Sequence, residues 1–181
     1  MPLCGIDEAG RGPLAGPLVI AGVVLENSIA GLDDSKKLSL KRREQLYDLI
    51  LQNATYHIAI FDAGCIDDYG IASVIKQGLF EITQNLQGCE YLFDGNTSFG
   101  VDGIKTLVKA DKLVQEVSAA SILAKVTRDR LMVKISKDYP EYGFDKHMGY
   151  GTKLHIEAIA LHGKSPIHRK SFLIRSLGEK S

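Results

Sequence analysis

Hydrophobic residues along the chain gather in short runs, separated by turns and by longer stretches of mixed character. The most continuous run lies within 17–26 and is rich in β-branched residues. Short apolar runs bounded by glycine or charged residues are typical of buried strands. The sequence therefore predicts five strands, at 3–8, 17–26, 55–62, 91–94 and 104–109.

Four longer stretches have helical spacing instead. Apolar residues three and four positions apart form one face of an amphipathic helix. The predicted helices cover 40–51, 71–86, 118–139 and 152–161. In the first of them, the predicted apolar face carries Leu40, Leu46, Leu49 and Ile50. We expect Pro140 to stop the third helix and Gly163 to end the last one.

Strands and helices alternate along the chain, without an internal repeat or a low-complexity linker. This alternation indicates an α/β or α+β fold. A chain of 181 residues is long enough to bury one hydrophobic core. We therefore expect a single α/β domain over 1–181, in which the residues from about 140 to 181 form a helical C-terminal part.

The composition places the chain among ordinary folded proteins. Hydrophobic residues make up 45% and charged residues 24% of the sequence, which excludes disordered, collagen-like and disulfide-scaffold classes. No apolar run approaches the ~20 residues of a membrane helix, and no leader sequence is recognisable. The three cysteines, Cys4, Cys65 and Cys89, lack C-x-x-C spacing and suit reduced, buried thiols. We expect a cytoplasmic protein with no membrane partner.

The charges balance in number but not in position. Lys and Arg number 22, as do Asp and Glu, so the formal net charge is zero. A neutral total argues mildly against a nucleic-acid-binding protein, whose domains are usually basic. The basic residues are nevertheless clustered, within 36–43 and within 164–175. Such clusters are most often solvated surfaces, and they become informative only beside a functional site.

A glycine-rich turn separates the first two predicted strands. Gly10, Gly12 and Ala15 match the spacing of the dinucleotide-binding fingerprint G-x-G-x-x-[GA]. That motif requires a helix after the turn, whereas a β-branched strand follows here. Asp7 and Glu8 would also repel a pyrophosphate. The sequence therefore disfavours a dinucleotide site.

Four carboxylates follow apolar runs that are predicted to be strands: Asp7, Glu8, Asp94 and Asp111. Ligands of open α/β sheets gather at the carboxyl ends of strands. Neighbouring strand residues point to opposite faces, so Asp7 and Glu8 share a site only if the pleat breaks beside them, as the turn at 9–12 allows. Converging carboxylates repel one another unless divalent cations bind them. The pattern predicts a site for Mg²⁺, with two ions balancing the four charges.

The stretch 5–17, which reads Gly-Ile-Asp-Glu-Ala-Gly-Arg-Gly-Pro-Leu-Ala-Gly-Pro, resembles the N-terminal signature of ribonuclease HII, the type 2 ribonuclease H. Further blocks that resemble this family follow in the family's order, so the resemblance covers nearly the whole chain. These blocks are Asp34-Ser35-Lys36-Lys37-Leu38-Ser39, Asp94-Gly95-Asn96, Lys109-Ala110-Asp111, 118–126, His147-x-Gly149-Tyr150-Gly151-Thr152 and His168-Arg169-x-Ser171-Phe172. Such an ordered set is highly specific, although the family more often has glycine at the position of Ala110.

The resemblance implies a ribonuclease H-like fold, in which helices flank a mixed five-stranded sheet and a helical segment forms the C-terminus. It implies an endonuclease that cuts the RNA strand of RNA/DNA hybrids and incises duplex DNA on the 5′ side of embedded ribonucleotides. By the same resemblance, Asp7, Glu8, Asp94 and Asp111 would be the catalytic and metal-binding acids. Two ions, Mg²⁺ or Mn²⁺, would activate water and stabilise the leaving 3′ oxygen, giving 5′-phosphate and 3′-hydroxyl ends.

The resemblance also implies which residues bind the substrate. The backbone at Gly10 and Gly12 can approach a 2′-hydroxyl, the group that distinguishes RNA from DNA, and Arg11 can hold a phosphate. Tyr150 resembles the family's tyrosine that packs on the sugar at the RNA–DNA junction. The remaining substrate-binding candidates are Lys36, Lys37, Ser118, Ser121 and Lys125. We expect the alanines of 118–126 to pack on the sheet, and the protein to act as a monomer.

Two other functions stay open at this point. The sister family, ribonuclease HIII, carries an additional N-terminal domain, for which a first strand at 3–8 leaves no room. A catalytically silent module that binds RNA/DNA hybrids is expected to have lost a metal-binding acid, whereas all four are present. The histidines lack the spacing of a zinc site, and we expect His155 and His162 to lie on the surface.

Overall fold

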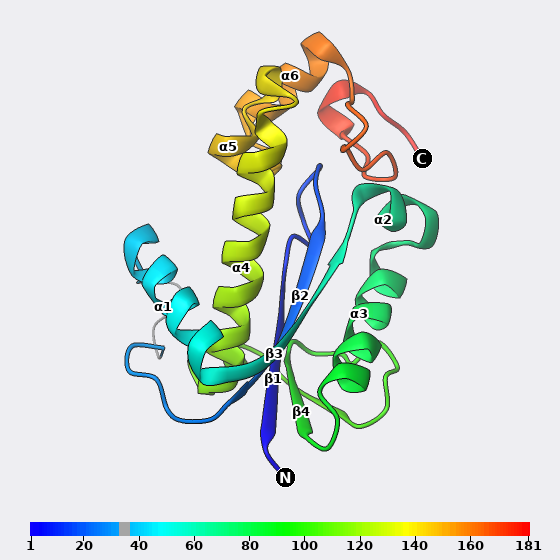
Figure 1. Cartoon of the computed structure of the whole chain (residues 1–181). Helices are drawn as coiled ribbons and strands as arrows, with labels where there is room; N and C mark the ends of the chain where they lie inside the picture. Colours follow the sequence, from blue (N-terminus) through cyan, green and yellow to red (C-terminus); the bar gives the residue numbers. More distant parts are fainter. Residues whose placement is uncertain (33–36) are drawn as a thin grey trace.

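A mixed sheet forms the centre of the protein, in a computed structural model that describes residues 1–32 and 37–181 (Figure 1). Its strands are β1 (Leu3–Ala9), β2 (Leu18–Leu25), β3 (Ala54–Phe61), β4 (Glu90–Asp94) and β5 (Ile104–Leu107). They lie in the order β3-β2-β1-β4-β5. β1, β2 and β3 pair antiparallel, whereas β1, β4 and β5 pair parallel. The prediction of a five-stranded mixed sheet is confirmed, with strand ends shifted by no more than two residues.

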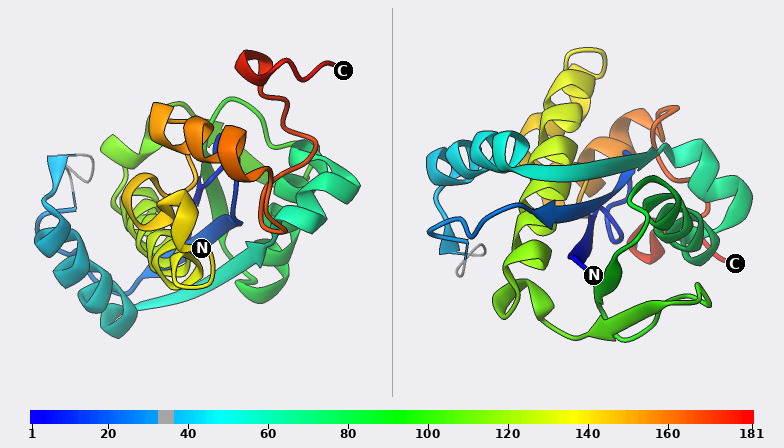
Figure 2. Two further views of the ribbon diagram at one scale, coloured as in Figure 1. Left: turned by 90° about the horizontal axis from the view of Figure 1, so that it is seen from above. Right: turned by 60° about the horizontal axis from the view of Figure 1, so that its bottom comes forward.

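Helices cover both faces of this sheet. Figure 2 shows α1 (Leu40–Asn53) and α4 (Gln115–Ser136) on one side, with α2 (Ala63–Tyr69) and α3 (Ile71–Asn85) on the other. The side chains of β2 alternate accordingly, because Val19 and Val23 pack toward α1 and α4 while Leu18 and Ile20 pack toward α3. Burial on both faces explains why this strand is a continuous apolar run in the sequence.

The predicted helices are present, and their ends differ in instructive ways. Ser39 caps α1 by accepting a hydrogen bond from the Arg42 N–H, and only Leu46 and Ile50 of the predicted apolar face are buried. α4 already ends at Ser136, so Pro140 begins a separate 3-10 helix instead of stopping α4. α3 and α6 (Lys153–His162) match their predicted ranges to within one residue.

The N-terminal end of α4 lies directly on β1. A Cβ atom added at Gly5 would lie 2.2 Å from backbone atoms of Glu116 and Val117. Only glycine permits this approach, because any side chain would push the helix away from the strand. Gly5 therefore holds the start of α4 close to Asp7, two residues further along β1.

The C-terminal part adds a third hydrophobic cluster beside the end of α4. It contains α5 (Phe144–His147) and α6, and its buried members include Ala15, Met132, Tyr142, Phe144 and Ile159. The short helices α2 and α5 were not predicted, since elements of four to seven residues carry too few periodic positions. Among the described helices, none has the length and apolar character needed to cross a membrane.

Two expectations about buried residues are wrong. His155 was expected on the surface, yet it is 0% exposed, because it lies on the side of α6 that faces the third cluster; His162 is exposed as expected. Of the three cysteines, Cys4 is buried, while Cys65 and Cys89 are only partly buried. All three thiols are free.

Candidate active site at the carboxyl ends of β1 and β4

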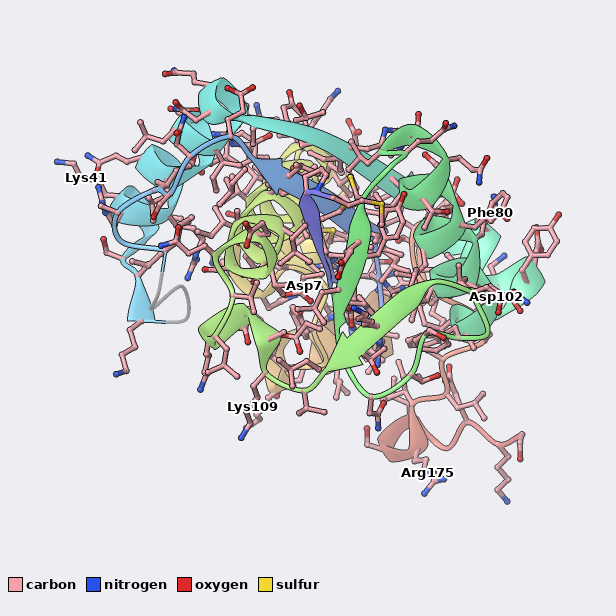
Figure 3. The ribbon with its side chains drawn as sticks, turned by 90° about the horizontal axis from the view of Figure 1, so that it is seen from below. Asp7, Lys41, Phe80, Asp102, Lys109 and Arg175 are labelled. Carbon is pink, nitrogen blue, oxygen red and sulfur yellow. The ribbon has the colours of Figure 1, made fainter. Side chains whose placement is uncertain are left out.

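Two parallel strands bring the first acids together. Ile6 of β1 pairs with Phe93 of β4, so Asp7 and Asp94 follow side by side at the same end of the sheet. Asp94 then gathers the segment after β5, because its carboxylate accepts hydrogen bonds from the N–H groups of Lys109 at 3.0 Å and Asp111 at 3.3 Å. Figure 3 shows Asp7 near the middle of the molecule, whereas Lys109 lies at its edge.

The side chain of Glu8, and not a break in the strand, brings this acid near Asp7. The β1–β2 ladder continues through Glu8–Ile20 and Ala9–Val19, and the pleat breaks only at Gly10, where φ is +95°. The expected break within 9–12 is therefore present, but it comes after Glu8 and does not bring Asp7 and Glu8 to one face. Instead, the side chain of Glu8 lies close enough to Asp7 that its charge helps to raise the pKa of Asp7. Asp7, Glu8, Asp94 and Asp111 together are called the acid cluster below.

Burial and mutual repulsion disfavour the charged forms of these acids. Burial, followed by the charges of Glu8 and Asp94, raises the pKa of Asp7 well above its ordinary value. Burial also raises the pKa of Glu8, against the opposing charge of Arg11, whose Nη2 lies 2.9 Å from Glu8 Oε1. For Asp94, burial and a side-chain hydrogen bond with Asp111 raise the pKa. A cation bound among these acids would offset their mutual repulsion and favour their charged forms.

The carboxylates of the acid cluster are suitable ligands for a hard divalent cation, but their side chains do not converge on one point. Carboxylate oxygens are the ligands that Mg²⁺ and Mn²⁺ prefer, and Glu8 Oε2 is buried without a hydrogen-bond partner. Over residues 1–32 and 37–181, no three His, Cys, Asp or Glu side chains converge as ligands of one ion. Glu8 is turned toward Arg11, and Asp7 accepts from the Glu8 N–H at 2.8 Å. Cation binding therefore requires these side chains to rotate.

A cavity of about 380 Å³ adjoins the acid cluster through Glu8. Its other lining residues are Ala9, Gly10, Arg11, Gly12, Arg43, Ser121, Ile122, Lys125 and Tyr150. Six of the predicted substrate-binding residues thus meet in one place, although they come from the turn after β1, from α4 and from the loop after α5. Arg43 was noticed only as part of a basic cluster, and Ile122 was not singled out.

Two other predicted substrate-binding residues, Ser118 and Lys37, are described by the structure and do not line this cavity. Ser118 is 1% exposed, and its hydroxyl donates to the carbonyl oxygen of Leu32, so the expectation of substrate contact is wrong for Ser118. Its small, buried side chain instead holds Leu32 against α4. Lys37 is exposed outside the cavity. Lys36 lies outside the described residues.

A buried arginine, Arg169, holds the turn at residues 10–12, called the glycine turn below, and a second, Arg128, holds residues that follow this turn. Arg169 donates to the carbonyl oxygens of Gly10 at 2.5 Å and Arg11 at 3.1 Å, and further to those of residues 16 and 17. Arg128 donates to the carbonyl oxygens of Ala15, Pro17 and Met148. Their fractional exposures are only 0% and 1%. Arg128 was missed, because a basic residue in a helical pattern is normally placed on the solvent side.

The turn, the tail and the Tyr150 loop are also joined through their backbones. Leu14 donates its N–H to the Gly149 carbonyl oxygen at 2.8 Å and accepts from the Arg169 N–H at 2.8 Å. Gly149 permits this approach, because a Cβ there would lie 2.4 Å from the carbonyl oxygen of Ala15. Tyr150, which is 42% exposed, is thereby held at the cavity, with the Arg128 guanidinium 5.5 Å from its ring centroid.

Comparison with known proteins agrees with this geometry. The family model described as ribonuclease HII matches residues 4–88 and 90–175. A ribonuclease HII of Sulfurovum sp. (strain NBC37-1) is 62% identical over 178 residues, covering 98% of this chain and 95% of that protein. A ribonuclease HII of Aliarcobacter butzleri (strain RM4018) is 56% identical over 179 residues, covering 98% of this chain and 93% of that protein.

A solved structure supports the same assignment. The ribonuclease HII in a complex with PCNA from Archaeoglobus fulgidus superimposes with a TM-score of 0.82 at 28% identity, covering 100% of this chain and 98% of that chain. The chain therefore belongs to the ribonuclease HII family, and the predicted family and ribonuclease H-like fold are confirmed. It is a ribonuclease H, a metal-dependent endonuclease that hydrolyses phosphodiester bonds.

We predict that Asp7→Asn stabilises the metal-free chain by about 1–2 kcal/mol, because it removes one of several repelling charges. Millimolar Mg²⁺ or Mn²⁺ should raise the melting temperature of the unsubstituted chain and have a smaller effect on this variant. Urea and thermal unfolding, with and without the cation, measure both effects. Asp102→Asn, at an exposed acid outside the cluster, is the control. Identical responses of the two variants would contradict the prediction.

Proposed function

We propose that this member of the ribonuclease HII family hydrolyses the RNA strand of RNA/DNA hybrids and incises duplex DNA on the 5′ side of embedded ribonucleotides. The proposal rests chiefly on the acid cluster at the ends of β1 and β4, which adjoins a cavity lined by the glycine turn and Tyr150. Asp7, Glu8, Asp94 and Asp111 would hold two divalent cations. When bound, Mg²⁺ or Mn²⁺ supplies the positive charge that offsets the phosphodiester and makes water nucleophilic.

The orientation of the glycine turn supports recognition of a 2′-hydroxyl or a phosphate. The carbonyl groups of Gly10 and Arg11 point inward, to Arg169. In a trans peptide the C=O and the following N–H point in opposite directions, and residues 10–12 contain no cis bond. The N–H groups of Arg11 and Gly12 therefore point away from Arg169, as donors for a ligand oxygen. The buried charge of Arg169 adds attraction for an anion at the same place.

Gly12 supports the same function, because no contact among residues 1–32 and 37–181 requires glycine there. Apart from its two chain neighbours, a Cβ at Gly12 would meet no atom of these residues within 4 Å, whereas one at Gly10 would lie 2.2 Å from Arg128 Nε. Gly10 is thus explained by packing and by its positive φ. Gly12 is explained by a ligand that approaches the bare backbone.

Tyr150 would select the neighbouring sugar. The glycine turn can detect one 2′-hydroxyl and so determines which nucleotide lies at the acids, but it cannot detect the next sugar. A flat ring packs well on a deoxyribose and would meet the added hydroxyl of a ribose. Tyr150 would therefore favour DNA on the 3′ side of the ribonucleotide.

Other basic groups would contact the backbone of the duplex. Lys125 lines the cavity beside Ser121, and its Nζ lies 2.9 Å from Asp129 Oδ1. Arg43 adds a second basic side chain to the lining. The predicted cytoplasmic location is supported by the three free thiols, which suit a reducing compartment. The monomeric state stays a prediction.

The function is tested by Asp7→Asn, Glu8→Gln, Asp94→Asn and Asp111→Asn. Each variant should lose activity by about 100-fold or more, because each removes a charge that positions the cation against the phosphate. Cleavage of a duplex with one embedded ribonucleotide, mapped on a gel with Mg²⁺ or Mn²⁺, measures the effect and identifies the ends. Near-normal turnover in two folded variants would contradict the four-acid site. Binding without any cleavage by the unsubstituted chain would indicate a silent hybrid-binding module.

Gly12→Ala should weaken substrate binding by about tenfold while leaving the melting temperature unchanged, because the added methyl group meets only the ligand. Gly64→Ala is the matched control, since its Cβ meets only Asp62 at 3.4 Å and lies in α2. Dissociation constants for a hybrid duplex, measured in Ca²⁺ to prevent cleavage, check the prediction. Equal affinities of the two variants would remove the argument for the glycine turn.

Tyr150→Ala should lower cleavage at a single embedded ribonucleotide about tenfold more than cleavage within a long RNA/DNA hybrid, since only the former depends on a neighbouring deoxyribose. Tyr150→Phe keeps the ring and should lose little on either substrate. Single-turnover rates on both substrates provide the comparison. Equal losses on the two substrates would show that Tyr150 serves packing instead of selection.

A further inference from the structure

Three histidines lie together in the hydrophobic cluster beside α5 and α6. His147, His155 and His168 are 9%, 0% and 1% exposed. The rings of His147 and His155 are stacked with centroids 4.3 Å apart, and Nε2 of His155 lies 2.9 Å from Nε2 of His168. Buried polar rings are tolerated when their nitrogens are hydrogen-bonded, so the partners of each nitrogen are informative.

These partners determine which nitrogen carries each hydrogen. Nδ1 of His155 lies 2.8 Å from the Tyr150 carbonyl oxygen, which can only accept, so this nitrogen donates. Nε2 of a neutral His155 must then accept from His168 Nε2. Nδ1 of His168 accepts from the Ser165 N–H at 2.8 Å, which agrees with a hydrogen on the other nitrogen. The hydrogen bonds thus run in one direction, from Ser165 through both rings to Tyr150.

The surroundings keep both rings neutral. Burial, followed by the nearby charges of His155 and Lys164, lowers the pKa of His168 from 6.5 to about 4. Burial likewise lowers the pKa of His155. The series of hydrogen bonds from Ser165 through His168 and His155 to Tyr150 therefore persists at neutral pH.

The series of hydrogen bonds ends at the loop that carries Tyr150. The Tyr150 carbonyl oxygen accepts from His155 and from the Thr152 N–H at 2.8 Å. Thr152 in turn caps α6 by accepting from the His155 N–H. The backbone of Tyr150 is thus tied to the first turn of α6, while its side chain lines the cavity.

The other end is the segment that holds the glycine turn. His168 forms an isolated antiparallel bridge with Ala15, and the next residue, Arg169, donates to the carbonyl oxygens of Gly10 and Arg11. The hydrogen bond between His155 and His168 is therefore a polar link between two loops that line the same cavity.

We infer that His155 and His168 are positioning residues, whose mutual hydrogen bond holds the Tyr150 ring at a constant distance from the glycine turn. The inference rests on the proposed function, in which the turn selects a ribonucleotide and Tyr150 selects the adjacent deoxyribose. Two selections on neighbouring nucleotides reinforce each other only when the selecting groups keep their spacing. The link contributes to the preference for an RNA–DNA junction and leaves hydrolysis itself to the acid cluster.

Two substitutions of the same kind separate this role from packing. His155→Gln keeps an amide near the position of Nε2 but loses the donor to Tyr150, so the hydrogen bond with His168 no longer connects to the Tyr150 loop. His168→Gln keeps a donor near the position of Nε2 and loses the contacts of Nδ1 with the Ser165 N–H and hydroxyl, so the connection from residue 168 through His155 to Tyr150 remains. Both exchanges have similar volume and occur in the same buried cluster, which makes the second variant a matched control for the first.

The readout is the ratio of single-turnover rates on a duplex with one embedded ribonucleotide and on a long RNA/DNA hybrid. His155→Gln should lower this ratio by about 3–10-fold, the effect of one lost hydrogen bond, and His168→Gln should change it by less than about twofold. In a Tyr150→Ala background, His155→Gln should have no further effect on the ratio. An unchanged ratio in folded His155→Gln, an equal fall in both variants, or a fall that persists in the Tyr150→Ala background would overturn the inference.

The same experiment distinguishes this inference from the proposed function. If Tyr150→Ala alone leaves the ratio unchanged, the proposed role of Tyr150 is wrong, and the inference fails with it. If Tyr150→Ala lowers the ratio and His155→Gln does not, only the inference fails.

A measurement on the unsubstituted chain applies even if a variant does not fold. Ring ¹⁵N chemical shifts at neutral pH, without metal or substrate, should show hydrogen on Nδ1 of His155 and on Nε2 of His168. Hydrogen on Nε2 of His155, or exchange between its two tautomers, would overturn the inference regardless of any activity.

Discussion

The position of the glycine turn depends on one buried side chain, Arg169. Its guanidinium group donates to the carbonyl oxygens of residues 10, 11, 16 and 17. A buried cation is unfavourable unless hydrogen bonds replace the lost water, and these carbonyl groups supply them. Burial, with the nearby charge of Arg128, lowers the pKa of Arg169 to about 10, so the group stays protonated at neutral pH. A permanent charge therefore holds the turn from inside and sets the direction of its N–H groups.

Because Arg169 comes from the C-terminal segment, the glycine turn takes its position only when both ends of the chain meet. The acids of the proposed reaction have a different origin, since Asp7 and Asp94 lie toward the carboxyl ends of paired strands of the sheet. In the proposed function, the sheet thus carries two of the acids and the loops carry the groups that bind the substrate, a division that is common in enzymes. These loops form few regular backbone hydrogen bonds. Side chains donate hydrogen bonds to their carbonyl groups instead, as His155 does to Tyr150.

This division also explains what the sequence could predict. The strands and the acid cluster were predictable, because apolar runs indicate strands and the carboxyl ends of strands meet at one edge. Arg128 and His155 were not, because each lies in a helical pattern where a polar residue is normally placed toward solvent. Their partners are mainly backbone carbonyl groups or a distant ring, which leave no mark in the sequence. Ser118 was misjudged for the same reason, since its partner is the Leu32 carbonyl.

The neutral net charge misleads because the charges are separated in space instead of paired. The acid cluster gathers negative charge on one side of the glycine turn, and Arg128 and Arg169 place positive charge behind it. A domain of zero net charge can therefore present a negative region and a positive region next to each other. Arg11 lies between the two kinds of charge, because its Nη2 pairs with Glu8 Oε1 at 2.9 Å. The zero total thus results from opposite charges gathered in different places around one turn.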